Sequence, residues 1–191
     1  EAMGLPNSIC REVDVRNRAA IKAAVADAEA EYGPVDMMFV NAGVARLADI
    51  GRQPPEEWDE MIDINTKGVM NTLHAVMSGM MERKTGTIFM MSSIAGRKVY
   101  PDHTVYCGTK YFVHAVSESI REYLSDYDVR VIVLSPGVIE TEVLSGVLDE
   151  QILAEYKENK VKMGGGIGPE HVSEIMLHAY QMPQNALIQE I

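Results

Sequence analysis

Two side chains near the middle of the sequence have the types and spacing needed to move a proton. Tyr106 and Lys110 are four residues apart, in the run Tyr-Cys-Gly-Thr-Lys, so on a helix they share one face, a single turn from each other. A phenol with its ordinary pKa of about 10 is a weak acid–base catalyst at neutral pH. A neighbouring ammonium favours the phenolate and lowers that pKa. We therefore predict that Tyr106 donates a proton to a carbonyl oxygen or removes one from an alcohol.

A tyrosine and a lysine at this spacing are common in proteins, so the prediction depends on the polar residues around them. Ser93 lies thirteen residues before Tyr106 and directly follows a short apolar run, where a hydroxyl can hydrogen-bond a substrate oxygen and orient it. Asn65 falls inside a helical pattern, a position that is unfavourable for asparagine unless it has a specific role. Both residues are therefore candidates for the same site.

Small and polar residues follow three successive apolar runs. The runs Val35–Val40, Gly86–Met91 and Val129–Ser135 are too short for helices and predict strands, and we expect the first to be buried on both faces. The residues that follow are Asn41, Ala42 and Gly43 after the first run, Ser92 and Ser93 after the second, and Pro136, Gly137, Ile139 and Thr141 after the third. Ligands bind at the carboxyl ends of parallel strands. One crevice at these three strand ends is therefore predicted.

Longer segments with helical spacing separate the apolar runs. The predicted order is strand Ser8–Val13, helix Asn17–Tyr32, strand Val35–Val40, helix Pro55–Arg83 with a break near Asp63, strand Gly86–Met91, helix Val105–Tyr127, strand Val129–Ser135, a loop and helix over Thr141–Lys160, a flexible joint at Gly164–Gly166, helix Pro169–Gln181 and strand Ala186–Ile191. Strands that alternate with helices form right-handed βαβ units. We predict an α/β fold with a doubly wound parallel sheet, in a single domain over residues 1–191.

The full set of motifs resembles the short-chain dehydrogenase/reductase family. The set is Asn-Ala-Gly at residues 41–43, Asn65, Ser93, Tyr-x-x-x-Lys from Tyr106 and Pro-Gly-x-x-x-Thr from Pro136, in this order. The combination is specific, although each piece alone is weak, and it extends over practically the whole chain. The resemblance implies a Rossmann-like fold and an oxidoreductase that uses NADP or NAD to interconvert a carbonyl and an alcohol. NADP is slightly favoured, because Ser145–Tyr156 and the Gln189–Ile191 ending resemble bacterial reductases of broad substrate range that prefer NADP.

The same resemblance implies a role for each residue of the site. Tyr106 is expected to be the general acid/base, with Lys110 lowering its pKa and binding the nicotinamide ribose, and Ser93 polarising the substrate oxygen. Asn65 is expected to hold a water molecule that links Lys110 to solvent. The implied cofactor contacts are Asp14 and Val15 at the adenine, Asn41, Ala42 and Gly43 along the adenosine side, Ile139 and Thr141 at the nicotinamide carboxamide, and also Tyr106, Lys110, Pro136 and Gly137.

The sequence departs from the family pattern at its start. Family members begin with a strand and a glycine-rich turn that holds the pyrophosphate at a helix N-terminus, and the sequence contains no such turn. We expect the intact protein to have an N-terminal βαβ portion of roughly 50 further residues, together with a few more at its C-terminus. The residue that separates NAD from NADP belongs to that portion.

Composition narrows the possible partners. A net charge of −11 argues against nucleic acid, because proteins that bind phosphate backbones usually carry a basic patch. No apolar run reaches the roughly 20 residues that span a bilayer, and the N-terminus lacks the features of a signal peptide, so we expect a cytoplasmic protein. The two cysteines and five histidines match no metal-ligand spacing. The family resemblance also suggests a homo-oligomer, a dimer or tetramer, joined through Pro55–Arg83, Val105–Tyr127 and the C-terminal region.

The segment Thr141–Gly166 is expected to close over the substrate. It mixes many charges with apolar side chains, namely Leu144, Val147, Leu148 and Leu153. This mixture predicts a partly apolar substrate pocket but identifies no substrate.

Two other functions are compatible with parts of the sequence. One is a non-catalytic relative that senses a cofactor or acts as a scaffold, although such a protein has no need of Tyr106 together with Lys110. The other is a serine hydrolase built from Ser93, His103 and Asp102. It lacks a Gly-x-Ser-x-Gly elbow, and three residues so close in sequence rarely form a triad. The oxidoreductase is therefore preferred.

Overall fold

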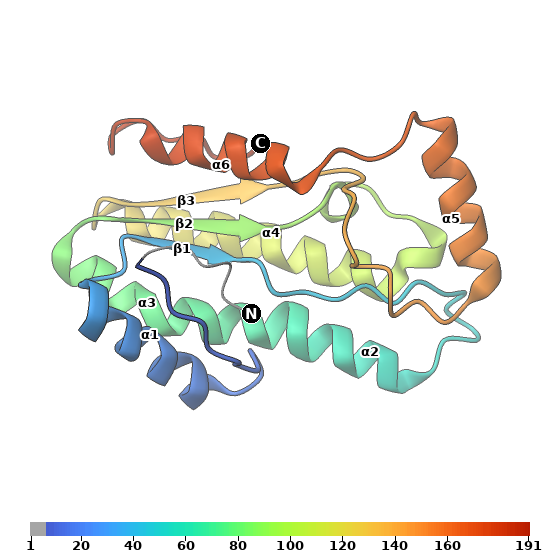
Figure 1. Ribbon diagram of the computed structural model, residues 1–191, viewed down its shortest axis with the longest axis horizontal. Helices are drawn as coiled ribbons and strands as arrows, with labels where there is room; N and C mark the ends of the chain where they lie inside the picture. The colour runs from blue at the N-terminus through green and yellow to red at the C-terminus, as the bar shows by residue number, and fades with distance from the viewer. Residues whose placement is uncertain (1–6) are drawn as a thin grey trace.

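A three-stranded parallel β-sheet forms the centre of the protein. The computed structural model describes residues 7–191, so the expectation about a signal peptide concerns residues outside the described range. The strands are β1 (Met37–Val40), β2 (Gly86–Met91) and β3 (Val129–Leu134), side by side in the order β1-β2-β3 (Figure 1). Because both pairings are parallel, the three carboxyl ends lie at one edge of the sheet. The predicted parallel α/β fold is confirmed.

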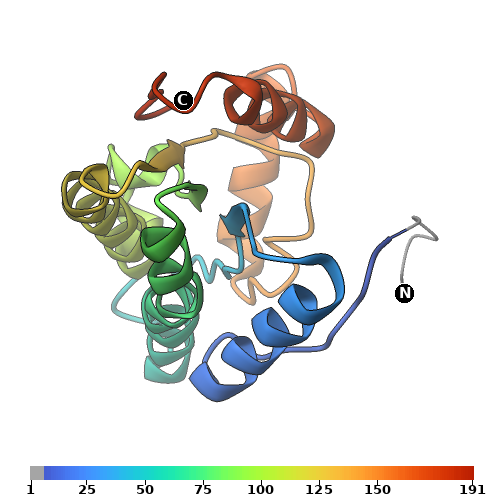
Figure 2. The same ribbon diagram turned by 90° about the vertical axis from the view of Figure 1, so that its left-hand side faces the viewer.

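Helices cover both faces of this sheet. The helices are α1 (Arg18–Tyr32), α2 (Pro55–Ile62), α3 (Val69–Arg83), α4 (Thr104–Ser125), α5 (Glu150–Lys162) and α6 (Pro169–Gln181). Figures 1 and 2 show α6 on one face and α3 and α4 on the other. Successive residues of a strand point to opposite faces, so Ile88 and Met90 pack toward α3 and α4, while Phe89 and Ile132 pack toward α6. The doubly wound arrangement is therefore confirmed. Among the described residues, no helix is both long and apolar enough to cross a membrane.

The long helix predicted over Pro55–Arg83 is interrupted close to the expected position. A π-helix, η1 (Asp63–Gly68), lies between α2 and α3. Short π-helical segments often occur at functional sites, and this one carries Asn65, which is buried. A β-carbon added to Gly68 would lie 2.6 Å from the Val15 side chain. The missing side chain of this glycine therefore allows the segment before α1 to pack against the helix.

Two predicted strands are wrong in part or in full. No strand forms over Ser8–Val13 in the described chain, where most of these residues are exposed, because a strand needs a neighbouring strand for its backbone hydrogen bonds. The run Val35–Val40 becomes a strand only from Met37, and only Val40 in it is buried. In the described chain β1 is an edge strand of the sheet, so its other residues are covered less fully than was predicted.

The last predicted strand, Ala186–Ile191, is reduced to a short contact with β3. Its backbone accepts and donates hydrogen bonds at Val133 and Ser135, at 2.8 to 3.0 Å. Only Glu190, opposite Val133, is paired as a bridge. The segment therefore extends the sheet for about one residue on the side of β3.

A buried arginine near the amino end of the sheet connects the strands to α6. Arg130, in β3, is 5% exposed. Its guanidinium donates to Thr87 Oγ1 and to the carbonyl oxygens of Tyr180 and Met182, each at 2.9 Å. The last carbonyls of a helix have no partner within that helix, and a positive charge is favourable beside them. Arg130 therefore satisfies the end of α6 and holds it on β2 and β3.

Candidate active site

The catalytic residues predicted from the sequence meet at the carboxyl end of β2. Ser93 directly precedes the 3₁₀-helix η2 (Ile94–Gly96), and its Oγ accepts a hydrogen bond from the Ala95 amide at 3.1 Å. The Ser93 side chain also hydrogen-bonds that of Tyr106, in the first turn of α4. One turn further along α4, Lys110 Nζ lies 5.7 Å from the centre of the Tyr106 ring. The fold therefore brings the serine, the tyrosine and the lysine together.

Burial changes the acidity of both members of the tyrosine–lysine pair. Lys110 is 5% exposed, and removal of its ammonium from water lowers its pKa from 10.5 to about 8. Tyr106 is only partly buried as a residue, but its hydroxyl lies deep enough that desolvation raises its pKa to about 12, against the opposing effect of the Ser93 hydrogen bond. In the chain alone, desolvation of the phenolate therefore dominates the acidity of Tyr106, and the lowering of this pKa by Lys110 stays a prediction.

Asn65 joins the loop after β1 to α4. Its Oδ1 accepts a hydrogen bond from the Val44 amide at 2.8 Å, and its Nδ2 donates to the Val44 carbonyl at 2.8 Å and to Thr109 Oγ1 at 3.1 Å. A β-carbon on Gly43 would lie 3.3 Å from Asn65 Oδ1 and 3.7 Å from Lys110 Nζ. The glycine therefore lets the strand end approach the lysine closely. Thr109 was not predicted, and its position directly before Lys110 is the only signal that the sequence offers.

The loop after β3 packs against the loop that carries the serine. The Pro136 carbonyl accepts a hydrogen bond from the Ile94 amide at 3.0 Å, and a β-carbon on Gly137 would lie 3.8 Å from the Ile94 side chain. Ile139 and Thr141 continue this loop, and the Thr141 amide donates to the Ile139 carbonyl at 3.0 Å. Pro136 and Gly137 are thus adjacent to the serine loop, while Thr141 is exposed further along.

The predicted adenosine contacts form a more exposed part of the site. The Asp14 carboxylate is 2.7 Å from the Arg16 guanidinium, and this hydrogen-bonded pair lowers the pKa of Asp14. The Val15 carbonyl accepts a hydrogen bond from Asn71 Nδ2 at 2.9 Å, which attaches this segment to α3. The residues directly after β1 are exposed, namely Asn41, Ala42 and Gly43.

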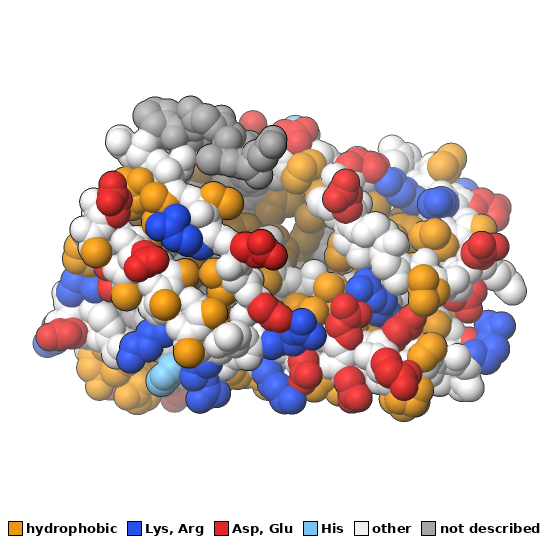
Figure 3. Space-filling view, turned by 60° about the horizontal axis from the view of Figure 1, so that its bottom comes forward, with side chains coloured by type: hydrophobic (Ala, Val, Ile, Leu, Met, Phe, Trp, Pro, Cys, Tyr) orange, Lys and Arg blue, Asp and Glu red, His pale blue; other side chains and the backbone are white. Residues whose placement is uncertain are grey.

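The side of the molecule that carries α1, α2 and α3 is hollowed. Figure 3 shows hydrophobic side chains inside the hollow and acidic and basic side chains around it. Within residues 7–191, no group of three or more His, Cys, Asp or Glu side chains is arranged to hold a metal ion. Sites with apolar walls and a few fixed polar groups are typical of those that bind organic ligands.

The segment predicted to close over the substrate packs near Tyr106, the candidate catalytic tyrosine. Val147 and Ile152 form an apolar cluster with Leu47, which follows β1, and Tyr106 packs against this cluster. Tyr156 from α5 joins the same cluster but was not predicted, because nothing in the local sequence relates it to the site. Leu148 is 76% exposed, so the prediction that it lines an apolar pocket is wrong for that residue.

Within this segment, ion pairs attach α5 at both of its ends. Arg52 pairs with Asp149, which caps α5, at 3.4 Å. Lys160, in the last turn of α5, pairs with Glu140 in the loop after β3. The glycines Gly164–Gly166 follow, and the first two have φ values of +90° and +95°, a region that favours glycine. Ion pairs therefore hold α5 at its first and last turns.

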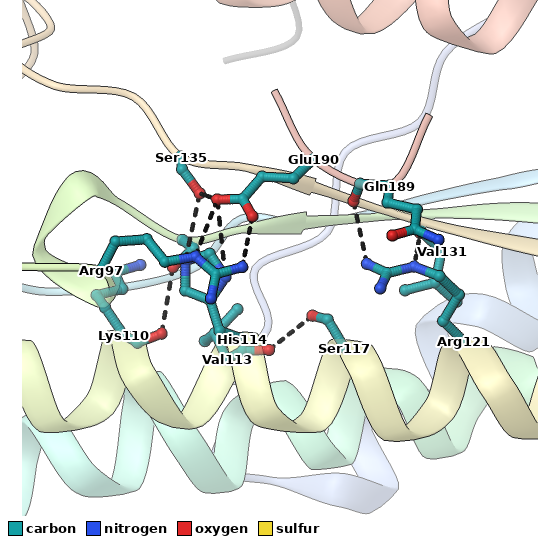
Figure 4. Close-up of polar contacts among 11 residues, drawn as sticks. Arg97, Lys110, Val113, His114, Ser117, Arg121, Val131, Ser135, Gln189 and Glu190 are labelled. Atoms are coloured by element: carbon teal, nitrogen blue, oxygen red, sulfur yellow. Dashed lines mark hydrogen bonds and ion pairs between the residues drawn. The ribbon is translucent and has the colours of Figure 1, made fainter. Parts of the chain in front are cut away.

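A polar cluster beside Lys110 connects the C-terminal segment to the candidate site (Figure 4). Glu190 accepts a hydrogen bond from Ser135 Oγ at 2.9 Å and forms an ion pair with Arg97. Ser135 Oγ also lies 3.3 Å from Nε2 of His114, which is one turn after Lys110 on α4. No local pattern predicts this cluster, because Glu190 is 55 positions from Ser135 and 93 from Arg97.

The residues of the alternative hydrolase site do not form a triad. His103 Nδ1 lies 2.8 Å from Asp102 Oδ1. Within the described chain, however, the Ser93 side chain bonds to Ala95 and Tyr106 and not to His103. A serine without a histidine partner lacks the base that a hydrolase needs.

Known proteins share this sequence and this arrangement. A sequence model of the short chain dehydrogenases matches residues 5–152. The chain belongs to the short-chain dehydrogenase/reductase family. An uncharacterised oxidoreductase of Staphylococcus saprophyticus is 31% identical over 185 residues, which cover 94% of this chain and 73% of the relative. A glycine betaine reductase of Emericella nidulans is 32% identical over the whole chain, but the match covers only 15% of that protein.

Solved structures of dehydrogenases superpose on most of this short-chain dehydrogenase/reductase. Serine dehydrogenase from Escherichia coli is 32% identical, with a TM-score of 0.79 over 95% of this chain and 73% of the other. A closed form of serine dehydrogenase complexed with NADP+ is equally identical, with a TM-score of 0.83 over 95% of this chain and 74% of the other. By family, the protein is an NAD(P)-dependent oxidoreductase.

Proposed function

We propose that this short-chain dehydrogenase/reductase interconverts a carbonyl group and an alcohol on a small molecule, with Tyr106 as its general acid/base. The observation that carries the proposal is the meeting of Ser93, Tyr106 and Lys110 at one strand end. A hydroxyl beside the phenol can hold the substrate oxygen while the phenol transfers a proton to it. Asn65 is a positioning residue, because its amide bonds fix the loop after β1 against α4.

The protonation states favour proton donation to a carbonyl. With a pKa of about 12, the Tyr106 hydroxyl keeps its proton at neutral pH, so it can donate that proton during reduction. Ser93 donates a hydrogen bond to the same substrate oxygen and orients it. Lys110, with a pKa of about 8, exchanges its own proton near neutral pH and can return one to the tyrosine.

The nicotinamide cofactor supplies or accepts the hydride, and its oxidised ring is positively charged, which favours the phenolate needed for oxidation. The residues present suit such a cofactor, because Gly43 leaves room beside Lys110 Nζ and the residues directly after β1, Asn41–Gly43, are exposed. The residues assigned to its binding are Asp14, Val15, Asn41, Ala42, Gly43, Tyr106, Lys110, Pro136, Gly137, Ile139 and Thr141.

NADP is the proposed cofactor, and the oligomer and location follow the family. The complex of a 32% identical serine dehydrogenase with NADP+ supports NADP. A homo-oligomer, a dimer or tetramer, is proposed through α2–α3 and α4, which expose the apolar side chains of Met70, Tyr111 and Tyr123. A single domain in the cytoplasm, acting on a small molecule rather than nucleic acid or membrane, completes the proposal.

Cofactor oxidation tests the proposed reaction. The intact protein is mixed with NADPH or NADH and a panel of aldehydes, ketones and quinones, and loss of the reduced nicotinamide is followed by absorbance. We expect turnover with at least one substrate, and Tyr106→Phe lowers kcat by about 10² to 10⁴ while NADPH binding, followed by fluorescence, is retained. Tyr32→Phe, which changes an exposed tyrosine of α1 outside the proposed subunit interface, is the matched control.

The same measurements distinguish the second candidate function. NADPH binding without turnover by the wild-type protein, across the entire panel, would support a cofactor sensor or scaffold in place of an enzyme. Absence of both binding and turnover would contradict both functions.

A further inference from the structure

A second polar side chain faces the catalytic tyrosine. His103 is the last residue of the 3₁₀-helix η3 (Pro101–His103), and its side chain is 14% exposed. The centre of its ring lies 6.2 Å from that of Tyr106 and 6.5 Å from that of Tyr156 in α5. The imidazole therefore stands beside both the proposed acid/base and the segment that packs over it.

A neighbouring carboxylate sets which nitrogen of this imidazole is free. His103 Nδ1 lies 2.8 Å from Asp102 Oδ1, and an ionised carboxylate only accepts hydrogen bonds, so Nδ1 carries the proton. The Asp102 carbonyl accepts a hydrogen bond from the Ala48 amide at 3.1 Å, which holds this pair against the buried loop after β1. In the neutral ring Nε2 is then an acceptor, and within residues 7–191 it has no hydrogen-bond partner.

The surroundings suit a neutral group rather than an anion. The cations on the neighbouring segments are each engaged: Arg46 with Glu60, Arg52 with Asp149, Lys160 with Glu140, Lys98 on the Tyr100 ring, and Lys110 with the Met91 carbonyl. The apolar cluster of Ala45, Leu47, Val147 and Ile152 packs against Tyr106 and Tyr156. A substrate carboxylate placed beside this imidazole would lose water and lie close to the Asp102 carboxylate, which is 2.8 Å from His103 Nδ1. It would also find no donor at the neutral Nε2, whereas a hydroxyl needs only one acceptor.

We infer that His103 is a specificity-determining residue, and that its Nε2 accepts a hydrogen bond from a hydroxyl group that the substrate carries beside the reacting carbonyl. The preferred substrates are then neutral hydroxyketones or hydroxyaldehydes, and the corresponding diols in the reverse direction. This inference rests on the proposed function, because it assumes that the carbonyl reacts at Tyr106. A site built to bond a hydroxyl discriminates against the analogue that lacks it, because the acceptor is then left unpaired.

Two ketones that differ in one group test the inference. Butanone has a methyl group where hydroxyacetone has its hydroxyl, so the ratio of their kcat/KM values measures the contribution of the hydroxyl. With NADPH and the intact wild-type protein we expect hydroxyacetone to be preferred. His103→Phe, which keeps an aromatic ring but removes the acceptor, is expected to lower that ratio about tenfold, mainly through a higher KM for hydroxyacetone. His171→Phe, which changes an exposed histidine of α6, leaves the ratio unchanged.

A second variant tests the same inference if His103→Phe fails to fold. Asp102→Asn keeps the imidazole but removes the carboxylate that fixes its tautomer, and it is expected to lower the same ratio by a smaller factor. An unchanged ratio in both variants, or equal use of both ketones by the wild type, overturns the inference and leaves the proposed function standing. A wild-type preference for pyruvate over hydroxyacetone that His103→Phe abolishes assigns the imidazole to an anion and also overturns it. If the wild type reduces no carbonyl at all, the proposed function itself fails.

Discussion

Two buried cations at opposite ends of the sheet differ in how their charge is satisfied. Lys110, beside the carboxyl end of β2, and Arg130, near the amino end of β3, are each 5% exposed. Arg130 donates to Thr87 Oγ1 and to several carbonyl oxygens at the end of α6. Lys110 donates to a single carbonyl, that of Met91, at 2.9 Å. The two cations are therefore equally buried, but Arg130 donates more hydrogen bonds than Lys110 does.

This difference separates a structural charge from a reactive one. A guanidinium stays protonated and presents several donors in a fixed plane, so it can be buried stably when each donor finds an oxygen. An ammonium with few partners responds to burial by a lower pKa, which reaches about 8 at Lys110. We infer that proton transfer takes place at the end of the sheet where a buried ammonium, that of Lys110, has few hydrogen-bond acceptors.

Removal of the lysine ammonium is expected to give the largest effect, and to affect activity rather than stability. Lys110→Met retains the length of the side chain but takes away the charge and the proton, so kcat for carbonyl reduction falls by about 10² to 10⁴. The free energy of unfolding at pH 7, measured in urea, stays the same or increases, because the variant no longer buries a poorly satisfied charge.

The pH dependence of stability is the control for this variant. The folded-state pKa of Lys110 lies below the unfolded value of 10.5, so the unfolded state binds more protons between about pH 8 and 10.5. Wild-type stability therefore rises with pH in that window, by up to about 3 kcal/mol, and this contribution is lost as the pH falls to 8. Measurements from pH 8 to 10 avoid the opposing effect of Tyr106, which begins above pH 10. A wild type and a Lys110→Met variant with the same slope would show that the lysine is not buried as described.

Removal of the arginine is expected to have the opposite pattern. Arg130→Met leaves Thr87 Oγ1 and the carbonyls of Tyr180 and Met182 without their donor, so the free energy of unfolding falls by about 3 kcal/mol. In the folded fraction, kcat stays close to the wild-type value. Arg130→Lys keeps the charge but not the planar set of donors, and its stability should lie between the two. A stable Arg130→Met protein with reduced kcat would reverse the comparison.

The smallest effect concerns the cluster next to the lysine. Burial lowers the pKa of His114 below the ordinary 6.5, with Arg97 acting in the same direction and Glu190 opposing it. The unfolded state therefore binds more protons just below pH 6.5, and stability falls as the pH drops through this range. His114→Gln should flatten the slope of unfolding free energy against pH between 6.5 and 5. An identical slope in the variant would assign the acid sensitivity to other groups.

Local patterns in the sequence were sufficient for most of the secondary structure. Strands β2 and β3 are almost entirely buried runs of mostly apolar residues, and the break predicted near Asp63 within Pro55–Arg83 corresponds to η1. The strand predicted at Ser8–Val13 failed because a strand exists only beside a partner, and residue type does not report one. Similarly, Leu148 has the chemistry of a core residue but lies exposed.

The proximity of the candidate catalytic residues could be predicted from the sequence. The physical reason for this also limits what could be predicted. The alternation of strands and helices forces strand ends to one edge, and this placement together with the family resemblance predicted that Ser93, Tyr106 and Lys110 lie close to one another. The acidity of these groups could not be predicted from the sequence. The burial of Lys110 and the raised pKa of Tyr106 result from the elements packed over them. The contact of His103 with Tyr156 is of the same kind.

By itself, the sequence determined the family and the α/β order of elements and identified the candidate catalytic side chains, because these depend on local periodicity and on short motifs. Only the tertiary structure decided which of two equally buried cations is satisfied, how far the tyrosine is desolvated, and which imidazole nitrogen is free beside it. Those properties arise from contacts between residues distant in sequence, such as Arg130 with Tyr180 and Glu190 with Arg97. They set the local dielectric and the hydrogen-bond partners on which proton transfer depends.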